Sequence, residues 1–176
     1  MIFAKALDDR AGCAVLLEML QQELPYDMTF AFTVQEEVGL RGAQTAAFKV
    51  CPDCALVVET TTAADLPGVL PEKIVCRLGY GPVVPFMDAA TIYDKAYYRL
   101  AMETAHEKNL PCQTKHAIAG GNDSSAIQKS RGGVRTCAVS LPCRYLHSPV
   151  VAALRSDLEA MERLIPSLAE KMAAGK

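Results

Sequence analysis

Two adjacent carboxylates, Glu36 and Glu37, follow an apolar alternating run over residues 28–35 and precede a turn that contains Gly39. If a strand ends at Gln35, both side chains lie in the following loop, where the backbone can aim them in different directions. One could then bind a metal ion while the other accepts a proton from water at that ion. Two adjacent glutamates without further ligands nearby most often form a solvated acidic turn. They indicate a metal site only if other ligands surround them.

Other potential metal ligands also stand after apolar segments or directly before an amphipathic one. Asp8 and Asp9 directly precede an amphipathic run, Glu59 ends an apolar segment, and His147 follows the apolar stretch 134–141. In open α/β sheets ligands bind outside the carboxyl ends of the strands, so such residues can converge on one point. Carboxylates together with imidazole suit zinc, cobalt or manganese. Each residue alone has a plainer explanation, as a helix N-cap, a strand-end acid or a hydrogen-bonded loop histidine.

Six short motifs occur in the same order as in a known family, and they cover nearly the whole chain. They lie at residues 6–12, 35–43, 65–68, 79–82, 120–123 and 144–149. On these motifs the chain resembles the deblocking or glutamyl aminopeptidases, which include the tetrahedral aminopeptidases and proteins named M-type endoglucanases. The Asp-Asp-Arg, Gln-Glu-Glu and Arg-Tyr-Leu-His-Ser-Pro blocks are the most specific.

The resemblance implies a metal-dependent hydrolase that releases N-terminal residues from peptides, with two divalent ions such as zinc, cobalt or manganese. It implies that Glu36 is the catalytic base and that an unusual peptide bond lies beside Asp9. It gives the 120–123 turn a part in shaping the substrate cleft. The metal ligands that it implies are Asp8, which bridges the ions, Glu37 and His147 on one ion, and Glu59 on the other.

The chain also departs from the family pattern. The family has a further metal-binding histidine in a His-x-Asp motif, followed by an inserted dimerisation domain, before its Asp-Asp-Arg block. Here His106 and His116 stand in other settings, Glu59 stands where Asp is usual, and Asn122 stands where Thr is expected. We therefore expect residues 1–176 to form a single catalytic-type domain that binds one ion or none. We also expect a monomer or small homo-oligomer rather than the family's dodecamer.

Composition narrows the possible fold, partners and location of the protein. Hydrophobic residues make up 51% of the chain and aromatic residues 6%, with no Trp, which is typical of aliphatic helices packed on a sheet. The net charge of −2 argues against a nucleic-acid partner. No membrane span or signal peptide is recognisable, so we expect a cytoplasmic protein. Seven cysteines, an odd number, indicate reduced thiols, and the C-x-x-C at 51–54 lacks the second pair of a zinc site.

Helical and strand patterns alternate along the chain, which predicts an α/β fold, a three-layer sandwich with a mixed central sheet flanked by helices. An irregular stretch at 60–71 could border the active site. Strands are expected at residues 28–35, 54–59, 73–78, 83–87, 112–115 and 134–141. Helices are expected at residues 10–24, 40–48, 94–108 and 124–129, with a last helix that starts at a capping box over 156–159 and kinks at Pro166.

Three functions of different classes remain open. The first is a metal-dependent aminopeptidase, and the second is a non-catalytic fragment that keeps a partial metal site. The third is a glycoside hydrolase, in which two carboxylates would flank a sugar bond. Sugar sites commonly carry aromatic platforms, so the absence of Trp weighs against the third.

Overall fold

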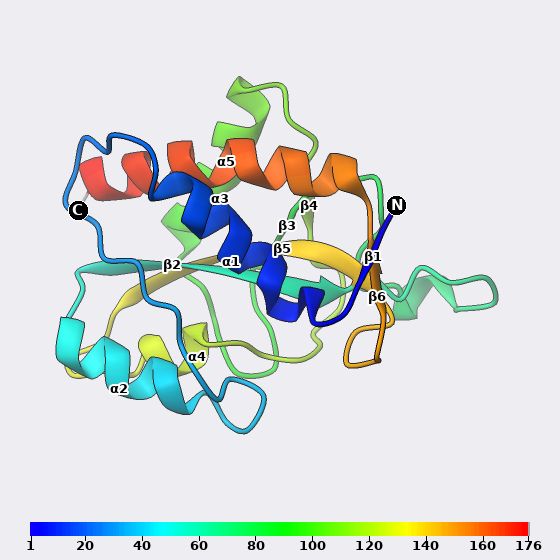
Figure 1. The fold of residues 1–176 in the computed structure, drawn as a ribbon, viewed down its shortest axis with the longest axis horizontal. Helices are drawn as coiled ribbons and strands as arrows, with labels where there is room; N and C mark the ends of the chain where they lie inside the picture. Colours follow the sequence, from blue (N-terminus) through cyan, green and yellow to red (C-terminus); the bar gives the residue numbers. More distant parts are fainter. Residues whose placement is uncertain (176) are drawn as a thin grey trace.

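In the computed structural model, which describes residues 1–175, six strands form one mixed sheet between two layers of helices (Figure 1). One face of the sheet is covered by α1 (Leu7–Met19), α3 (Lys95–Glu107) and α5 (Arg155–Ala174). The other face is covered by α2 (Arg41–Val50) and α4 (Ser124–Ile127). The predicted α/β sandwich is therefore confirmed. None of the helices within residues 1–175 is both long and apolar enough to cross a membrane.

The centre of the sheet is a parallel pair of long strands. β2 (Cys54–Thr62) runs beside β5 (Arg135–Arg144) over its whole length, from Cys54 opposite Arg135 to Thr62 opposite Cys143. β5 also pairs antiparallel with β3 (Val83–Val84) and with β6 (Val151–Ala153). Outside these, β4 (Gln113–Thr114) lies parallel to β3, and β1 (Ile2–Ala4) lies antiparallel to β6.

Burial of β5 on both faces organises the core, since eight of its ten residues are buried. Successive side chains of a strand point to opposite faces of the sheet. Val139 and Leu141 accordingly join the large cluster beneath α1, α3 and α5, whereas Ala138 joins a smaller cluster with Val57 and Tyr93 on the side of α4. A strand covered on both faces reads as a nearly continuous apolar run, which explains why the sequence pattern locates it well.

The strand predicted at residues 28–35 is wrong, because this segment lies outside the helices and strands. Its apolar residues nevertheless divide between the interior and the surface. Met28 and Phe30 pack against the main core, while Phe32 and Val34 are exposed. The pattern therefore reports correctly which side chains are buried. It does not report whether a neighbouring strand is available for pairing, and among the described residues β2 pairs only with β5.

The strand predicted at residues 73–78 is also wrong. A 3-10 turn, η1 (Pro71–Lys73), stands at its start, and the amides of Val75 and Cys76 both donate to the carbonyl of Ala63 at 3.1 Å. The amide of Leu78 donates to Asp65 Oδ2 at 3.0 Å. Separate backbone and side-chain hydrogen bonds thus hold this segment in place of the strand pairing that the pattern predicted.

The predicted capping box does not cap α5. The helix begins at Arg155, so Ser156 lies inside its first turn, and the N-cap residue Leu154 makes no side-chain hydrogen bond to it. Asp157 instead accepts hydrogen bonds from the amides of Gly79, at 2.8 Å, and Gly81, at 2.9 Å. Both glycines have positive φ, which favours glycine. The acid of the predicted box, Glu159, accepts a hydrogen bond from Arg155 Nε at 3.0 Å, so the box does not form.

The other elements differ mainly in their boundaries. α2, α3, α4, β2 and β5 overlap the predicted ranges closely. α1 starts and ends earlier than predicted, β3 and β4 are only two residues long, and α5 continues as helix through Pro166. β1 and β6, of three residues each, were not predicted because so short a run has no measurable period.

Candidate metal centre

Asp8 and Asp9 occupy the first turn of α1 without adopting helical dihedral angles, and the peptide bond between them is cis. The amide of Gly12 donates to Asp9 Oδ1 at 2.9 Å. A Cβ atom at Gly12 would stand 2.3 Å from Asp9 Oδ2, so only glycine leaves room for this carboxylate. The start of α1 therefore holds Asp9 against the helix, next to Asp8.

Glu36 and Glu37 lie in a tight turn that leads into α2. The carbonyl of Glu36 accepts a hydrogen bond from the amide of Gly39 at 3.0 Å. The amide of Gly42, at the start of α2, donates to the carbonyl of Val34 at 2.9 Å, and a Cβ atom at Gly42 would lie 2.4 Å from that oxygen. Gly42 thus allows a close backbone contact, whereas Gly39 supplies a φ of 114°, and the two hydrogen bonds fix the turn that carries the glutamates.

His147 follows β5 in a loop in which it and Tyr145 both have a φ of 61°. The amide of Ser148 donates to the carbonyl of Tyr145 at 3.1 Å and closes this loop. At its base, Arg144 Nε donates to Asp65 Oδ1 at 2.6 Å. The stretch around Asp65, predicted from the sequence to be irregular, therefore supports the loop that carries the histidine.

Three of the predicted ligands converge. His147 Nε2 lies 3.5 Å from Asp8 Oδ2 and 3.4 Å from Glu37 Oε2, and the three ligand atoms are all within 4.8 Å of one another. Tetrahedral ligation with bonds of about 2.1 Å places ligand atoms about 3.4 Å apart, so the donor set and its spacing fit a zinc-type ion. The side chains of Glu37 and His147 are 58% and 67% exposed, which leaves this group open to solvent.

The predicted ligand Glu59 borders this group without belonging to it. It is buried, and its Oε1 accepts a hydrogen bond from the amide of Thr60 at 2.9 Å. Burial, reinforced by the charge of Asp9, raises the pKa of Glu59 to about 10. Burial likewise raises the pKa of Asp9 to about 8, against the opposing hydrogen bond from Gly12. Within residues 1–175 a single group, built around His147, offers three ligand atoms to one ion.

Glu36, the predicted catalytic base, is partly buried beside the three ligands. Burial raises its pKa to about 7, and the negative charges of Asp123, Glu37 and Asp8 add to this rise, while His147 opposes it. A carboxyl group with a pKa near neutrality can both accept and return a proton under ordinary conditions. The same turn therefore presents one acid suited to ligation and one suited to proton transfer.

Sequence reasoning assigned no individual role to Asp123 or Thr33, yet the structure joins them next to Glu36. Thr33 Oγ1 donates to Asp123 Oδ2 at 2.6 Å. The only signal in the sequence was the position of Asp123 directly after the Gly120-Gly121 turn. A contact between residues so far apart in the chain leaves no periodic trace that could have identified it.

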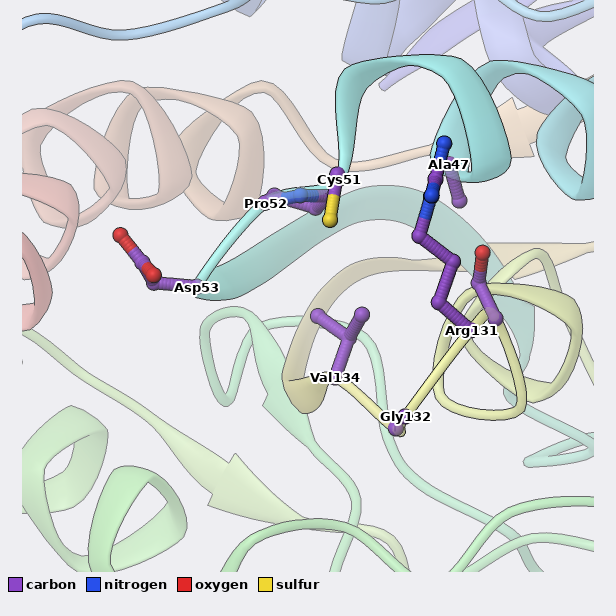
Figure 2. Close-up of a pocket in the computed structure, with 9 residues that line it drawn as sticks. Ala47, Cys51, Pro52, Asp53, Arg131, Gly132 and Val134 are labelled. Carbon is purple, nitrogen blue, oxygen red and sulfur yellow. The ribbon is translucent and has the colours of Figure 1, made fainter.

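A cavity of about 340 Å³ lies elsewhere, at the end of α2 opposite to the glutamate turn (Figure 2). Because α2 has ten residues, its ends are about 15 Å apart. The cavity is lined by Cys51, Pro52 and Asp53 on one side and by Arg131, Gly132 and Val134 on the other. It contains none of the predicted site residues.

Comparison with curated proteins identifies relatives of known class. The family model for M42 glutamyl aminopeptidases matches residues 1–164. A putative aminopeptidase from Acetivibrio thermocellus is 40% identical over 166 residues, which are 93% of this chain and 50% of that protein. The glutamyl aminopeptidase of Lactococcus lactis is 34% identical over 151 residues, which are 84% of this chain and 41% of that protein.

Solved structures give the same result. An aminopeptidase from the archaeon Desulfurococcus kamchatkensis matches with a TM-score of 0.91 and 35% identity over 96% of this chain and 49% of its own. A Thermotoga maritima protein named endoglucanase matches with a TM-score of 0.74 and 34% identity over 97% of this chain and 50% of its own. The chain thus spans about half the length of the relatives that it matches. Since the family model covers nearly all of its residues, the chain belongs to the M42 glutamyl aminopeptidase family.

Proposed function

We propose that this chain supplies the metal-binding and proton-transfer residues of an aminopeptidase that releases N-terminal residues from peptides. The observation that carries this proposal is the convergence of Asp8, Glu37 and His147, with Glu36 beside them. The family is metal-dependent and its substrates are peptides. An exposed group of ligands also suits a substrate whose end must approach from solvent.

Asp8, Glu37 and His147 would hold a zinc, cobalt or manganese ion. Such an ion, when bound, polarises a carbonyl group and makes water a stronger nucleophile at neutral pH. Glu36 would accept the proton of the attacking water and return it to the leaving amine, for which its pKa of about 7 is suitable. Asp9 and Gly12 keep the first turn of α1 in the shape that presents Asp8 to its two partners.

A second ion, held in this proposal by Asp8 and Glu59, would have fewer ligands. Glu59 already gives one oxygen to the amide of Thr60 and lies outside the three-ligand group. This observation favours a second candidate function, a non-catalytic protein that binds one ion. We therefore expect one ion per chain and a low turnover of peptides by the chain alone.

The test is release of amino acids from peptides with free and with acetylated N-termini, in the presence of zinc, cobalt or manganese. We expect slow release from the free peptides only, and a fall of about 100-fold or more in Glu36→Gln, because that variant keeps its shape but cannot accept the proton. Equal activity in Glu36→Gln would contradict the role of Glu36. Metal binding without any peptide release would establish the second candidate.

The same samples distinguish a peptidase from a glycoside hydrolase. Hydrolysis of a soluble glucan in place of peptides would support the glycoside hydrolase. Light scattering of the same protein is expected to show a monomer or small homo-oligomer, and a dodecamer would contradict that expectation.

A further inference from the structure

We propose that Asp123 is a positioning residue, which fixes the glutamate turn, residues 33–40, through the hydroxyl group of Thr33. The proposal deepens the proposed function and rests on it where metal binding is concerned. Three observations support it: the place of Thr33 in the chain, the rigid setting of Asp123, and the use that Asp123 makes of its two oxygens.

Thr33 stands where the turn needs an anchor. The preceding residues 28–32 form no strand, so no ladder of backbone hydrogen bonds fixes the approach to the turn. Other polar contacts of the turn close it on itself or join it to the start of α2, as from Gly42 to Val34, or run from Glu37 to Asp8 and His147. The 2.6 Å bond from Thr33 to Asp123 instead connects the turn to an element 90 residues away.

The carbonyl of Asp123 accepts hydrogen bonds from two amides of α4, and a buried network lies beside it at Asn122. The neighbouring Asn122 accepts a hydrogen bond from the amide of Ser124 at 2.9 Å and donates to Tyr93 Oη at 3.1 Å. Tyr93 in turn donates to Asp88 Oδ2 at 2.5 Å. Asp123 itself is only 8% exposed. Its position is therefore set by contacts that do not involve the glutamate turn.

The side chain of Asp123 does not cap the helix at whose start it stands. Asp123 is the N-cap residue of α4, where an aspartate commonly accepts a hydrogen bond from the helix, yet it makes no such bond. Oδ2 accepts from Thr33, and Oδ1 is buried without a hydrogen-bond partner among the described residues. Its charge lies close enough to Glu36 to raise the pKa of that carboxyl. The carboxylate thus serves the glutamate turn rather than its own helix.

Zinc affinity and amide hydrogen exchange of residues 34–40 test the proposal with three variants. Thr33→Val removes the hydroxyl group and keeps the shape, and it is expected to weaken zinc binding about tenfold and to speed exchange in the turn. Thr33→Ser restores the hydroxyl group and should behave as the parent. Thr45→Val is the matched control: its hydroxyl donates to the carbonyl of Gly42 within α2, and its loss should change zinc affinity by no more than about twofold.

A double-mutant cycle separates anchoring from a general loss of stability. Asp123→Ala and Thr33→Val should each weaken zinc binding, and the two together should weaken it no further than one alone. Additive effects, or parent-like affinity in folded Thr33→Val, would overturn the proposal. If Thr33→Val fails to fold, the zinc affinities of Asp123→Ala and Thr33→Ser test the proposal instead. The first should be weakened and the second should match the parent.

The failure of this proposal can be told apart from failure of the proposed function. A parent protein that binds no zinc would refute the metal centre. Amide hydrogen exchange of residues 34–40 needs no bound ion, so it still tests whether the bond from Thr33 to Asp123 fixes the turn. Unchanged exchange of residues 34–40 in Thr33→Val would then refute the positioning role of Asp123.

Discussion

Replacing His147 with alanine is expected to abolish tight binding of a zinc-type ion, with a loss greater than the 10- to 100-fold that is common for outer-shell changes. The imidazole provides the nitrogen of the three-ligand group, 3.5 Å from Asp8 Oδ2 and 3.4 Å from Glu37 Oε2. Without it, two carboxylates remain, and that of Glu37 is largely exposed, so it would have to be ordered from solvent. The parent chain is expected to bind one ion.

Competition with a chromophoric chelator measures both the affinity and the number of ions. His106→Ala is the matched control, because His106 is exposed on α3, outside the three-ligand group. Two tight equivalents in the parent, or binding by His147→Ala as strong as that of His106→Ala, would show that the ligand assignment is wrong. The number of ions also distinguishes the proposed single site from a complete two-ion centre.

Without metal, the free energy of unfolding is expected to decrease as the pH rises from about 5 to about 8. The folded protein raises the pKa of Asp9 from 3.8 to about 8 and that of Glu59 from 4.5 to about 10, mainly by burial. Above pH 4.5 the unfolded chain has released these protons while the folded chain keeps them. Each group that stays protonated only in the folded state lowers stability by about 1.4 kcal/mol per pH unit.

Urea denaturation in the presence of a chelator, at a series of pH values, measures this loss. Glu59→Gln places a neutral side chain of similar shape in the site, so it should be more stable than the parent at pH 8 and similar at pH 5. Asp65 acts in the opposite sense, because hydrogen bonds from Arg144 and Leu78 outweigh burial and lower its pKa. Its contribution to stability is therefore constant above about pH 4 and is lost only as the pH falls below that value. A rise in stability between pH 5 and pH 8 would contradict the prediction.

The sequence predicts those elements whose burial leaves a strong local pattern. β5 and β2 are apolar runs that lie between two helical layers, and they fall close to the predicted ranges. Residues 28–35 show that an equally clear alternation is not sufficient, since strand formation also needs a neighbour with free backbone groups. The carboxylate of Asp157 shows the same limit for capping, because the amides that donate to it are 76 and 78 residues away.

For the candidate site, the motifs predicted that Asp8, Glu37 and His147 would lie together, and the structure places them so. Their roles as ligands stay a prediction until an ion is bound. Glu59, predicted to bind the second ion, lies outside the three-ligand group, and its role as a ligand stays a prediction. The bond from Thr33 to Asp123 was not predicted, since neither residue type nor local spacing records a contact across 90 residues.

The unpaired segment before the glutamate turn also affects how copies of this protein behave in concentrated solution. Residues 28–34 read Met-Thr-Phe-Ala-Phe-Thr-Val, a seven-residue run without charge or proline, and its Phe32 and Val34 face solvent. Segments of this composition stack between molecules into cross-β aggregates. Negative charges flank the run, at Asp27 on one side and at Glu36 and Glu37 on the other, and flanking charges of this kind oppose stacking. A divalent cation bound by Glu37 would offset part of this negative charge, so we expect metal loading to lower the resistance of the chain to aggregation.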